Sequence, residues 1–296
     1  MREVTIATVQ FQPKLSEPED NLVKMSEFVS KIASQQKVDL IVFPELATSG
    51  YELGVGFTEV AQRVPGPAIN LMAQRAAEYG VYIGFGLVTK EKVESVIFNS
   101  AVLVGPDGEL VGHYNKVHLR GEERMAFREG YRFPVFETEI GNIGLMVGWD
   151  LAFPEVSRSL ALEGAEILCA ITNWEAGHMD EYRTYVKSRA FENALFVAAS
   201  NRVGEDVTLA FGGESMIVGP RGRIYAEVKA ETSKTADASG GGDSEKGKSA
   251  ASDAKNIPEG YAVARIDLDD VRKNREQFQM IQERQPTAYR TIVKRY

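Results

Sequence analysis

Apolar residues follow two different spacings along this chain. Short runs of β-branched and other apolar residues, such as VTIATVQF at 4–11 and VDLIVF at 38–43, are typical of buried strands. Between them, Ser16–Ala33 repeats its apolar residues every three or four positions, and this spacing predicts an amphipathic helix. The chain therefore begins with a strand, a helix and a second strand.

The same alternation continues to the far end of the chain. Helices are predicted at Pro67–Tyr79, Pro154–Glu163, Met179–Asn193 and Asp269–Arg275. Strands are predicted at Val81–Thr89, Val96–Val104, Leu110–Lys116, from Ile143, and at Ile167–Thr172, Leu195–Asn201, Glu214–Val218, Arg223–Val228 and Tyr261–Ile266. Helices spaced between strands indicate an α/β fold in which helices cover layered sheets.

Three segments do not fit this alternation. Residues 117–133 are polar and irregular, so we expect a surface loop with at most one helical turn, a type of loop that often carries function. Residues 230–256 contain no aromatic or large aliphatic side chain and are predicted to be a flexible low-complexity insertion, a solvated loop without a function of its own. The tail, 282–296, carries aromatic and basic residues suited to packing on a partner subunit.

Composition and charge narrow the class of protein. A length of 296 residues with 44% hydrophobic content can form one large domain, which we take as residues 1–296. A formal net charge of −8 argues against nucleic acid or an anionic membrane surface as the main partner. No apolar run is long enough to span a bilayer, and the first residues, MREVTIATVQFQP, lack the apolar core of a signal peptide. We therefore expect a cytoplasmic enzyme.

The cysteine and histidine content argues against a metal centre. Cys169 is the only cysteine, so the chain has neither an internal disulfide nor a cysteine-based metal cluster. His113, His118 and His178 do not show the spacing of a metal-binding motif. We expect no metal and no other cofactor.

Three positions at strand ends are candidates for chemistry. The run GNIGLMV stops at Gly148 and turns toward a helix beginning near Pro154; such a turn suits a nucleophile and an oxyanion, yet glycine has no side chain to react. Glu45 follows VDLIVFP and Lys116 ends LVGHYNK. Ligand sites gather at this edge of α/β sheets. Taken singly, Glu45 is equally compatible with a solvated or helix-capping carboxylate, and Lys116 with a surface lysine.

Three segments together resemble a known family. FPELATSGY, YNKVHL and GLMVGWDLAFPE are similar to the three signature segments of the nitrilase superfamily of carbon–nitrogen hydrolases, in order and at fitting separations. Flanking agreement includes FNSAVLVGPDG, RAFENALFVAASNRVG, GGESMIVGPRG and ERQPTAY, so the resemblance covers nearly the whole chain. It implies a four-layer αββα sandwich that pairs into αββααββα dimers. Pro154–Glu163 and Met179–Asn193 are the interface candidates, with the tail crossing to the partner.

The resemblance also implies a set of catalytic residues. By motif position, Glu45 is the general base, Lys116 is the lysine, and the cysteine nucleophile belongs at residue 148. A second glutamate often helps to position the substrate in this family; we assign it to Glu123 rather than to Glu122. The set is chemically coherent, because a carboxylate can take the thiol proton while an ammonium stabilises the thiolate and the tetrahedral intermediate.

Gly148 departs from the family pattern. Its neighbours in WDLAFPE still match, which argues against a shifted alignment. Cys169 does not replace the thiol, because it lies inside the apolar run AEILCAITNW and is expected to be a buried core residue. Either the nucleophile was removed by engineering, or the chain is a natural pseudoenzyme. Retention of Glu45, Lys116 and Glu123 favours the first explanation, because buried charges are costly to keep.

These observations predict a hydrolase of non-peptide C–N bonds. The form that carries a thiol at residue 148 is expected to be a small-carboxamide amidase that works through a thioester, and the chain with glycine is expected to be inactive or nearly so. Activity as a nitrilase or an N-carbamoyl amide hydrolase is the alternative, and a non-catalytic ligand-binding protein is the alternative of another class. The expected partners are a small-molecule amide or nitrile and further copies of the chain, in a homodimer or higher homo-oligomer. Candidate substrate-binding residues are Tyr51, Trp149, Asn173 and Trp174, although ordinary core packing would also account for the aromatic ones.

Overall fold

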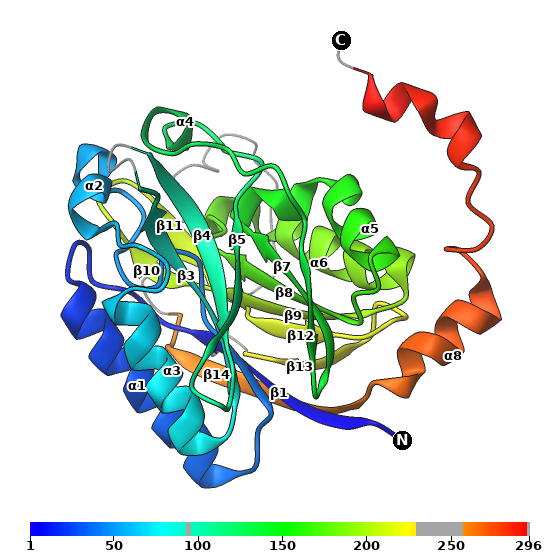
Figure 1. The fold of residues 1–296 in the computed structure, drawn as a ribbon, viewed down its shortest axis with the longest axis horizontal. Coiled ribbons are helices and arrows are strands. Elements are labelled where there is room, and N and C mark those ends of the chain that lie inside the picture. Colours follow the sequence, from blue (N-terminus) through cyan, green and yellow to red (C-terminus); the bar gives the residue numbers. More distant parts are fainter. Residues whose placement is uncertain (93–95, 229–256, 295–296) are drawn as a thin grey trace, which may run out of the picture.

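Two six-stranded sheets lie face to face in the computed structural model, which describes residues 1–92, 96–228 and 257–294 (Figure 1). The first sheet has the order β14-β1-β2-β3-β4-β5, and the second has the order β13-β12-β9-β8-β7-β6. The first contains β1 (Glu3–Gln10), β2 (Leu40–Val42), β3 (Tyr82–Lys90), β4 (Ile97–Val104), β5 (Leu110–Asn115) and β14 (Gly260–Asp267). The second contains β6 (Val135–Thr138), β7 (Gly141–Val147), β8 (Ile167–Thr172), β9 (Phe196–Asn201), β12 (Met216–Val218) and β13 (Ile224–Glu227).

Helices cover the outer face of each sheet. α1 (Pro18–Gln35) and α3 (Pro67–Tyr79) pack on the first sheet, while α5 (Pro154–Leu162) and α6 (Met179–Asn193) pack on the second (Figure 1). The layers therefore run helix, sheet, sheet, helix, and the predicted αββα fold class is confirmed. The remaining helices of the described residues are α2 (Phe57–Val60), α4 (Glu123–Ala126) and α8 (Asp269–Phe278), with 3₁₀ helices at Gly54–Gly56, Gly148–Ala152, Ala176–His178 and Pro286–Val293.

Hydrophobic burial explains why these segments form these elements. α1 buries Met25, Val29 and Ile32, the residues whose spacing predicted the helix, against the first sheet. β8 is buried along its whole length because the other sheet covers one of its faces and helices cover the other. Its residues alternate between these two layers, so Cys169 faces the core between the sheets.

The parallel strands at the centre of each sheet set the position of the candidate site. β1, β2 and β3 are parallel, and so are β7, β8 and β9. Parallel neighbours end at a common edge, where the loops after β2 and β7 meet the loop after the antiparallel strand β5. Those three loops carry the candidate residues.

Several short elements were not predicted from the sequence. β6 pairs with β7, and β10 (Val203–Glu205) pairs with β11 (Ala210–Gly212) in a small separate sheet. The 117–133 loop contains a single helical turn, α4, as expected. The predicted insertion at 230–256 lies outside the described residues. Among the helices of the described ranges, none combines the length and the apolar character that a membrane span requires.

Candidate active site

The three candidate residues come from both sheets and converge between them. Glu45 lies three residues after β2, Lys116 directly follows β5, and Gly148 directly follows β7. Glu45 and Lys116 are almost fully buried, with 1% and 2% of their surface exposed. Fully buried charges are rare unless they are paired, so these two residues need partners close by.

Lys116 is paired with two carboxylates. Its ammonium nitrogen lies 2.8 Å from Glu45 Oε1, and 2.6 and 2.9 Å from the two carboxylate oxygens of Glu123. Glu123 lies in α4 and is buried, whereas Glu122 is exposed. The geometry therefore distinguishes the two glutamates: Glu123 contacts the lysine.

Gly148 lies next to the charged cluster of Glu45, Lys116 and Glu123. A Cβ atom built on Gly148 would lie 2.7 Å from the ammonium nitrogen of Lys116 and 2.7 Å from Glu45 Oε1, with Glu45 Oε2 also in contact. The backbone of Gly148 has a φ of +50°, which L-residues seldom adopt, as at the strained turn that carries nucleophiles in other enzymes. A side chain at residue 148 would therefore touch both the acid and the ammonium.

Asn99 completes the cluster and was not identified from the sequence. Its side-chain amide donates to Glu45 Oε1 at 2.7 Å and to Glu123 Oε1 at 3.1 Å. The backbone N–H of Asn173 donates to Glu45 Oε2 at 3.0 Å, and that of Arg120 donates to Glu123 Oε2 at 2.8 Å. The available signal was an amide side chain inside β4, a strand that is apolar except for Asn99 and Ser100 and in which every position is buried.

The electrostatics suit proton transfer at Glu45. Burial raises the pKa of Glu45, and the charge of Lys116 only partly offsets this. Burial by itself lowers the pKa of Lys116, but the charges of Glu123 and Glu45 outweigh it, so the net pKa of the lysine is raised. The lysine thus stays an ammonium, while the carboxylate becomes a stronger base than an exposed glutamate.

A small pocket of about 250 Å³ adjoins this cluster. Its lining comes from the loops at 51–57, 120–126 and 208–209, together with Glu175, and it includes Glu123 and Tyr51. Tyr51 is the one predicted substrate-binding residue found in this lining. The Trp149 ring is half-buried and packs against Phe153. Trp174 lies in the hydrophobic core beside α6, and Asn173 is near the cluster through its backbone.

A buried ion pair orders the rim of this pocket. Arg202 is fully buried and binds both carboxylate oxygens of Asp206, at 2.9 and 2.7 Å, while its guanidinium lies over the Phe211 ring at 4.2 Å. Asp206 also accepts hydrogen bonds from the backbone N–H groups of Tyr51 and Glu52. The 51–57 loop and the loop between β10 and β11 are thereby held together.

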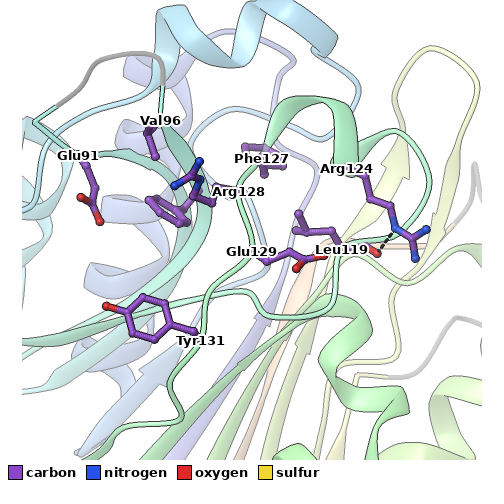
Figure 2. A pocket seen from close by; sticks show the side chains of 9 residues that line it. Glu91, Val96, Leu119, Arg124, Phe127, Arg128, Glu129 and Tyr131 are labelled. Carbon is purple, nitrogen blue, oxygen red and sulfur yellow. Dashed lines mark hydrogen bonds between the residues drawn. The ribbon is translucent and has the colours of Figure 1, made fainter. Parts of the chain in front are cut away.

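A larger hollow of about 690 Å³ is lined in part by Leu119, Arg124, Phe127, Arg128, Glu129 and Tyr131 (Figure 2). Figure 2 shows Arg124 turned toward the carbonyl oxygen of Leu119, to which it donates at 3.1 Å, with Arg128, Glu91 and Tyr131 around the opening. Neither Glu45 nor Lys116 lines it. We assign the candidate site to the smaller pocket because that pocket contains Glu123.

The only cysteine in the sequence lies in the core between the two sheets. Cys169 is completely buried between the sheets, and burial raises the pKa of its thiol to about 12. Over residues 1–92, 96–228 and 257–294, no group of histidine, cysteine, aspartate or glutamate residues could hold a metal ion.

Comparison with known proteins identifies the family. The family profile described as carbon-nitrogen hydrolase matches residues 5–239. The chain belongs to the carbon–nitrogen hydrolase family. It is 39% identical to a probable nitrilase of Schizosaccharomyces pombe, over 98% of this chain and 99% of that protein. It is 28% identical to an N-carbamoylputrescine amidase of Solanum lycopersicum, over 99% of this chain and 95% of that protein.

Solved structures of nitrilase-superfamily proteins share the fold of this hydrolase. One is a cysteine-to-alanine mutant of the Nesterenkonia AN1 amidase, with a TM-score of 0.79 and 24% identity over 98% of this chain and 97% of that chain. Another is a member of branch 10 of the superfamily from Saccharomyces cerevisiae, with a TM-score of 0.79 and 20% identity over 94% of each chain. At these identities the likeness establishes the fold of the hydrolase alone.

Proposed function

We propose that the form of this hydrolase with a cysteine at residue 148 is an amidase of small carboxamides. The observation that carries the proposal is the position of Gly148: a Cβ there would contact both the carboxylate of Glu45 and the ammonium of Lys116. That contact is what a thiol needs, since it must lose a proton to a base and then attack beside a positive charge. With glycine at this position the covalent route is closed.

The proposed reaction proceeds in two balanced halves. Glu45 takes the thiol proton, the sulfur attacks the amide carbon, and the carbonyl oxygen becomes an oxyanion that Lys116 stabilises. The oxyanion then collapses, the C–N bond breaks, and the nitrogen leaves as ammonia with the proton from Glu45. A water then gives its proton to Glu45 and attacks the thioester, which releases the carboxylic acid and restores the thiol.

Two features support a small substrate. The pocket beside the cluster holds about 250 Å³, which is below the ~300–1,000 Å³ of common ligand pockets. The Arg202–Asp206 pair holds two of its walls together, the 51–57 loop and the loop between β10 and β11, so that side of the pocket is not expected to widen easily. A nitrile or an N-carbamoyl amine of similar size is the alternative substrate, because the relatives reported above include both a probable nitrilase and an N-carbamoylputrescine amidase.

The competing hypothesis is a ligand-binding protein that keeps the pocket without catalysis. The deciding experiment is to make Gly148→Cys and to measure ammonia release from a panel of short amides, nitriles and ureido acids. Ammonia release by Gly148→Cys, with release by the parent chain lower by roughly 10³ to 10⁶, is the expected result. A folded Gly148→Cys protein that turns over nothing in the panel would favour the binding protein.

We further propose that residues 1–296 act as one hydrolase domain in a cytoplasmic homodimer or higher homo-oligomer. α5, α6 and the tail at 282–296 would supply the subunit contact. The support for this is a row of exposed apolar side chains on the tail, for which a partner surface is the simplest physical use: Tyr289, Ile292 and Val293.

A further inference from the structure

The carboxylate of Asp150 is completely buried and accepts four hydrogen bonds. Its Oδ2 accepts from the hydroxyl of Tyr114 at 2.6 Å and from the backbone N–H of Val147 at 3.3 Å. Its Oδ1 accepts from the backbone N–H of His118 at 2.9 Å, and the ring Nδ1 of His118 lies at the same distance. Both oxygens are therefore fully used, and neither points into the substrate pocket.

These partners flank the two reactive positions on both sides of the site. Tyr114 and His118 lie two residues before and two residues after Lys116. Val147 directly precedes Gly148, and Asp150 itself lies in the 3₁₀ helix that Gly148 begins. Because Tyr114 belongs to the first sheet and Val147 to the second, one carboxylate joins the lysine segment to the nucleophile turn across the gap between the sheets.

The position of the His118 ring is fixed as well. It stacks on Phe153 with ring centroids 3.7 Å apart and an angle of 11° between the planes. Phe153 immediately precedes α5, so the ring joins the lysine segment to the far end of the same turn. The imidazole donates to Asp150 only when Nδ1 carries a proton, and this bond selects that tautomer or the charged ring.

We propose that Asp150 is a positioning residue that sets the separation between the ammonium of Lys116 and the side chain at residue 148. The inference rests on the proposed function, because it concerns the thiol form of the site. Asparagine does not reproduce the carboxylate: whichever atom of residue 150 becomes the NH₂ group, a backbone N–H, that of His118 or that of Val147, would face a donor. The lysine segment or the turn would then move, and a misplacement of about 1 Å can reduce a rate by about 100-fold.

The test uses the Gly148→Cys protein, with Asp150→Asn or Tyr114→Phe added. The first measurement is the rate of alkylation by iodoacetamide as a function of pH, which reports the pKa of the introduced thiol without requiring a substrate. Cys169 does not interfere, because it is buried and its thiol pKa is about 12; the parent chain serves as the blank. Groups facing the thiol are Glu45 and Lys116, and behind them Glu123.

With Asp150→Asn, we expect the alkylation profile to shift to higher pH, because the ammonium lies farther from the sulfur. We also expect kcat to fall by up to about 100-fold with little change in KM, because Asp150 does not touch the substrate. Tyr114→Phe removes one of the four donors. It should shift the alkylation profile to higher pH and lower kcat, both by less than Asp150→Asn does. It also carries the test if Asp150→Asn does not fold.

A matched pair separates hydrogen bonding from packing. His118→Leu and His118→Asn both lose the stack on Phe153, but only asparagine can still donate to Asp150, so its profile should be closer to that of the unaltered histidine. A lower melting temperature with an unchanged alkylation profile and unchanged kcat would overturn the proposal. If Gly148→Cys alkylates normally but hydrolyses nothing, the proposed function fails, and the alkylation profiles still decide the role of Asp150.

Discussion

The backbone of Glu45 lies directly against Gly86 in the neighbouring strand β3. A Cβ atom on Gly86 would lie 2.6 Å from the Cα of Glu45 and 2.6 Å from the backbone nitrogen of Leu46. Hydrogen bonds from Gly86 to the Pro44 carbonyl and from Ala47 to the Gly86 carbonyl hold the two segments together. The position of Glu45, the proposed base, therefore depends on a residue without a side chain, forty-one positions further along the chain.

Gly86→Ala should displace Glu45. The new methyl group meets backbone atoms that cannot rotate away, so we expect the free energy of unfolding to fall by about 1–3 kcal/mol and the activity of Gly148→Cys to fall with it. Gly84→Ala is the matched control in the same strand, because a Cβ there has its nearest neighbours at 3.9 Å. Urea denaturation of both variants checks this, and equal losses would contradict it.

Removal of the lysine charge should cost more than removal of one carboxylate charge. Lys116→Gln leaves two buried carboxylates without a cation, for which we expect a loss of about 3–5 kcal/mol in the free energy of unfolding. Glu45→Gln leaves Lys116 paired with Glu123 and should cost far less. Glu122→Gln, at the exposed neighbour of Glu123, should have no measurable effect. Equal losses for Lys116→Gln and Glu45→Gln would show that the cluster is not coupled.

The pH dependence of Glu45→Gln has a definite sign. Since the pKa of Glu45 is raised above its ordinary 4.5 in the fold, the folded state binds the proton more tightly than the unfolded state. Its contribution to stability is present below pH 4.5 and is lost as the pH rises through the raised value. Relative to the parent, Glu45→Gln should therefore become more stable between pH 4.5 and neutrality. Thermal unfolding across that range measures the trend, and a trend of opposite sign would refute the raised pKa.

Any side chain at residue 148 should reduce stability. With a φ of +50°, Gly148→Ala adopts a left-handed backbone, which costs roughly 1–2 kcal/mol, and it must also move the ends of Glu45 and Lys116. Gly80→Ala isolates the backbone cost, because Gly80 has a φ of +65° and a Cβ there would have nothing within 4 Å. We expect the larger loss at residue 148, by chemical denaturation. Equal losses at the two positions would mean that Glu45 and Lys116 move away from the new methyl group without a loss of stability.

The tail should carry a subunit contact. Figure 1 shows it leaving the two sheets after α8, and Tyr289 and Ile292 line a hollow of about 460 Å³ against α5. Replacing both with glutamate should convert an oligomer to a monomer in sedimentation velocity, because charge would be buried at the contact. Val55→Glu, at an apolar residue that is 93% exposed in the 51–57 loop, should leave the oligomer intact. A parent chain that is monomeric at micromolar concentration would contradict the prediction.

The sequence alone predicted the bounds of several helices and strands correctly. α3 (Pro67–Tyr79) and β8 (Ile167–Thr172) have the predicted bounds, because the spacing of the first, the apolar run of the second and the flanking residues all agree. α6 (Met179–Asn193) also has the predicted bounds, although its apolar residues follow no clear helical period. β6, β10 and β11 are too short to show a period, and each is held by pairing with its neighbour along the chain, β6 with β7 and β10 with β11. Sequence alone therefore identified the layers but not every strand at their edges.

For the candidate site, too, the sequence predicted some residues and the tertiary structure added others. The sequence, through its resemblance to the nitrilase superfamily, predicted the αββα fold class. It also singled out Glu45, Lys116 and Gly148, because each follows an apolar strand within a recognisable segment. Only the tertiary structure decided which glutamate contacts the lysine and brought in Asn99 and Asp150. The contact of Lys116 with Glu123 depends on how the segment after β5 folds back, and that of Asn99 with Glu123 brings this segment against β4. The bond of Tyr114 to Asp150 arises only when the two sheets pack against each other.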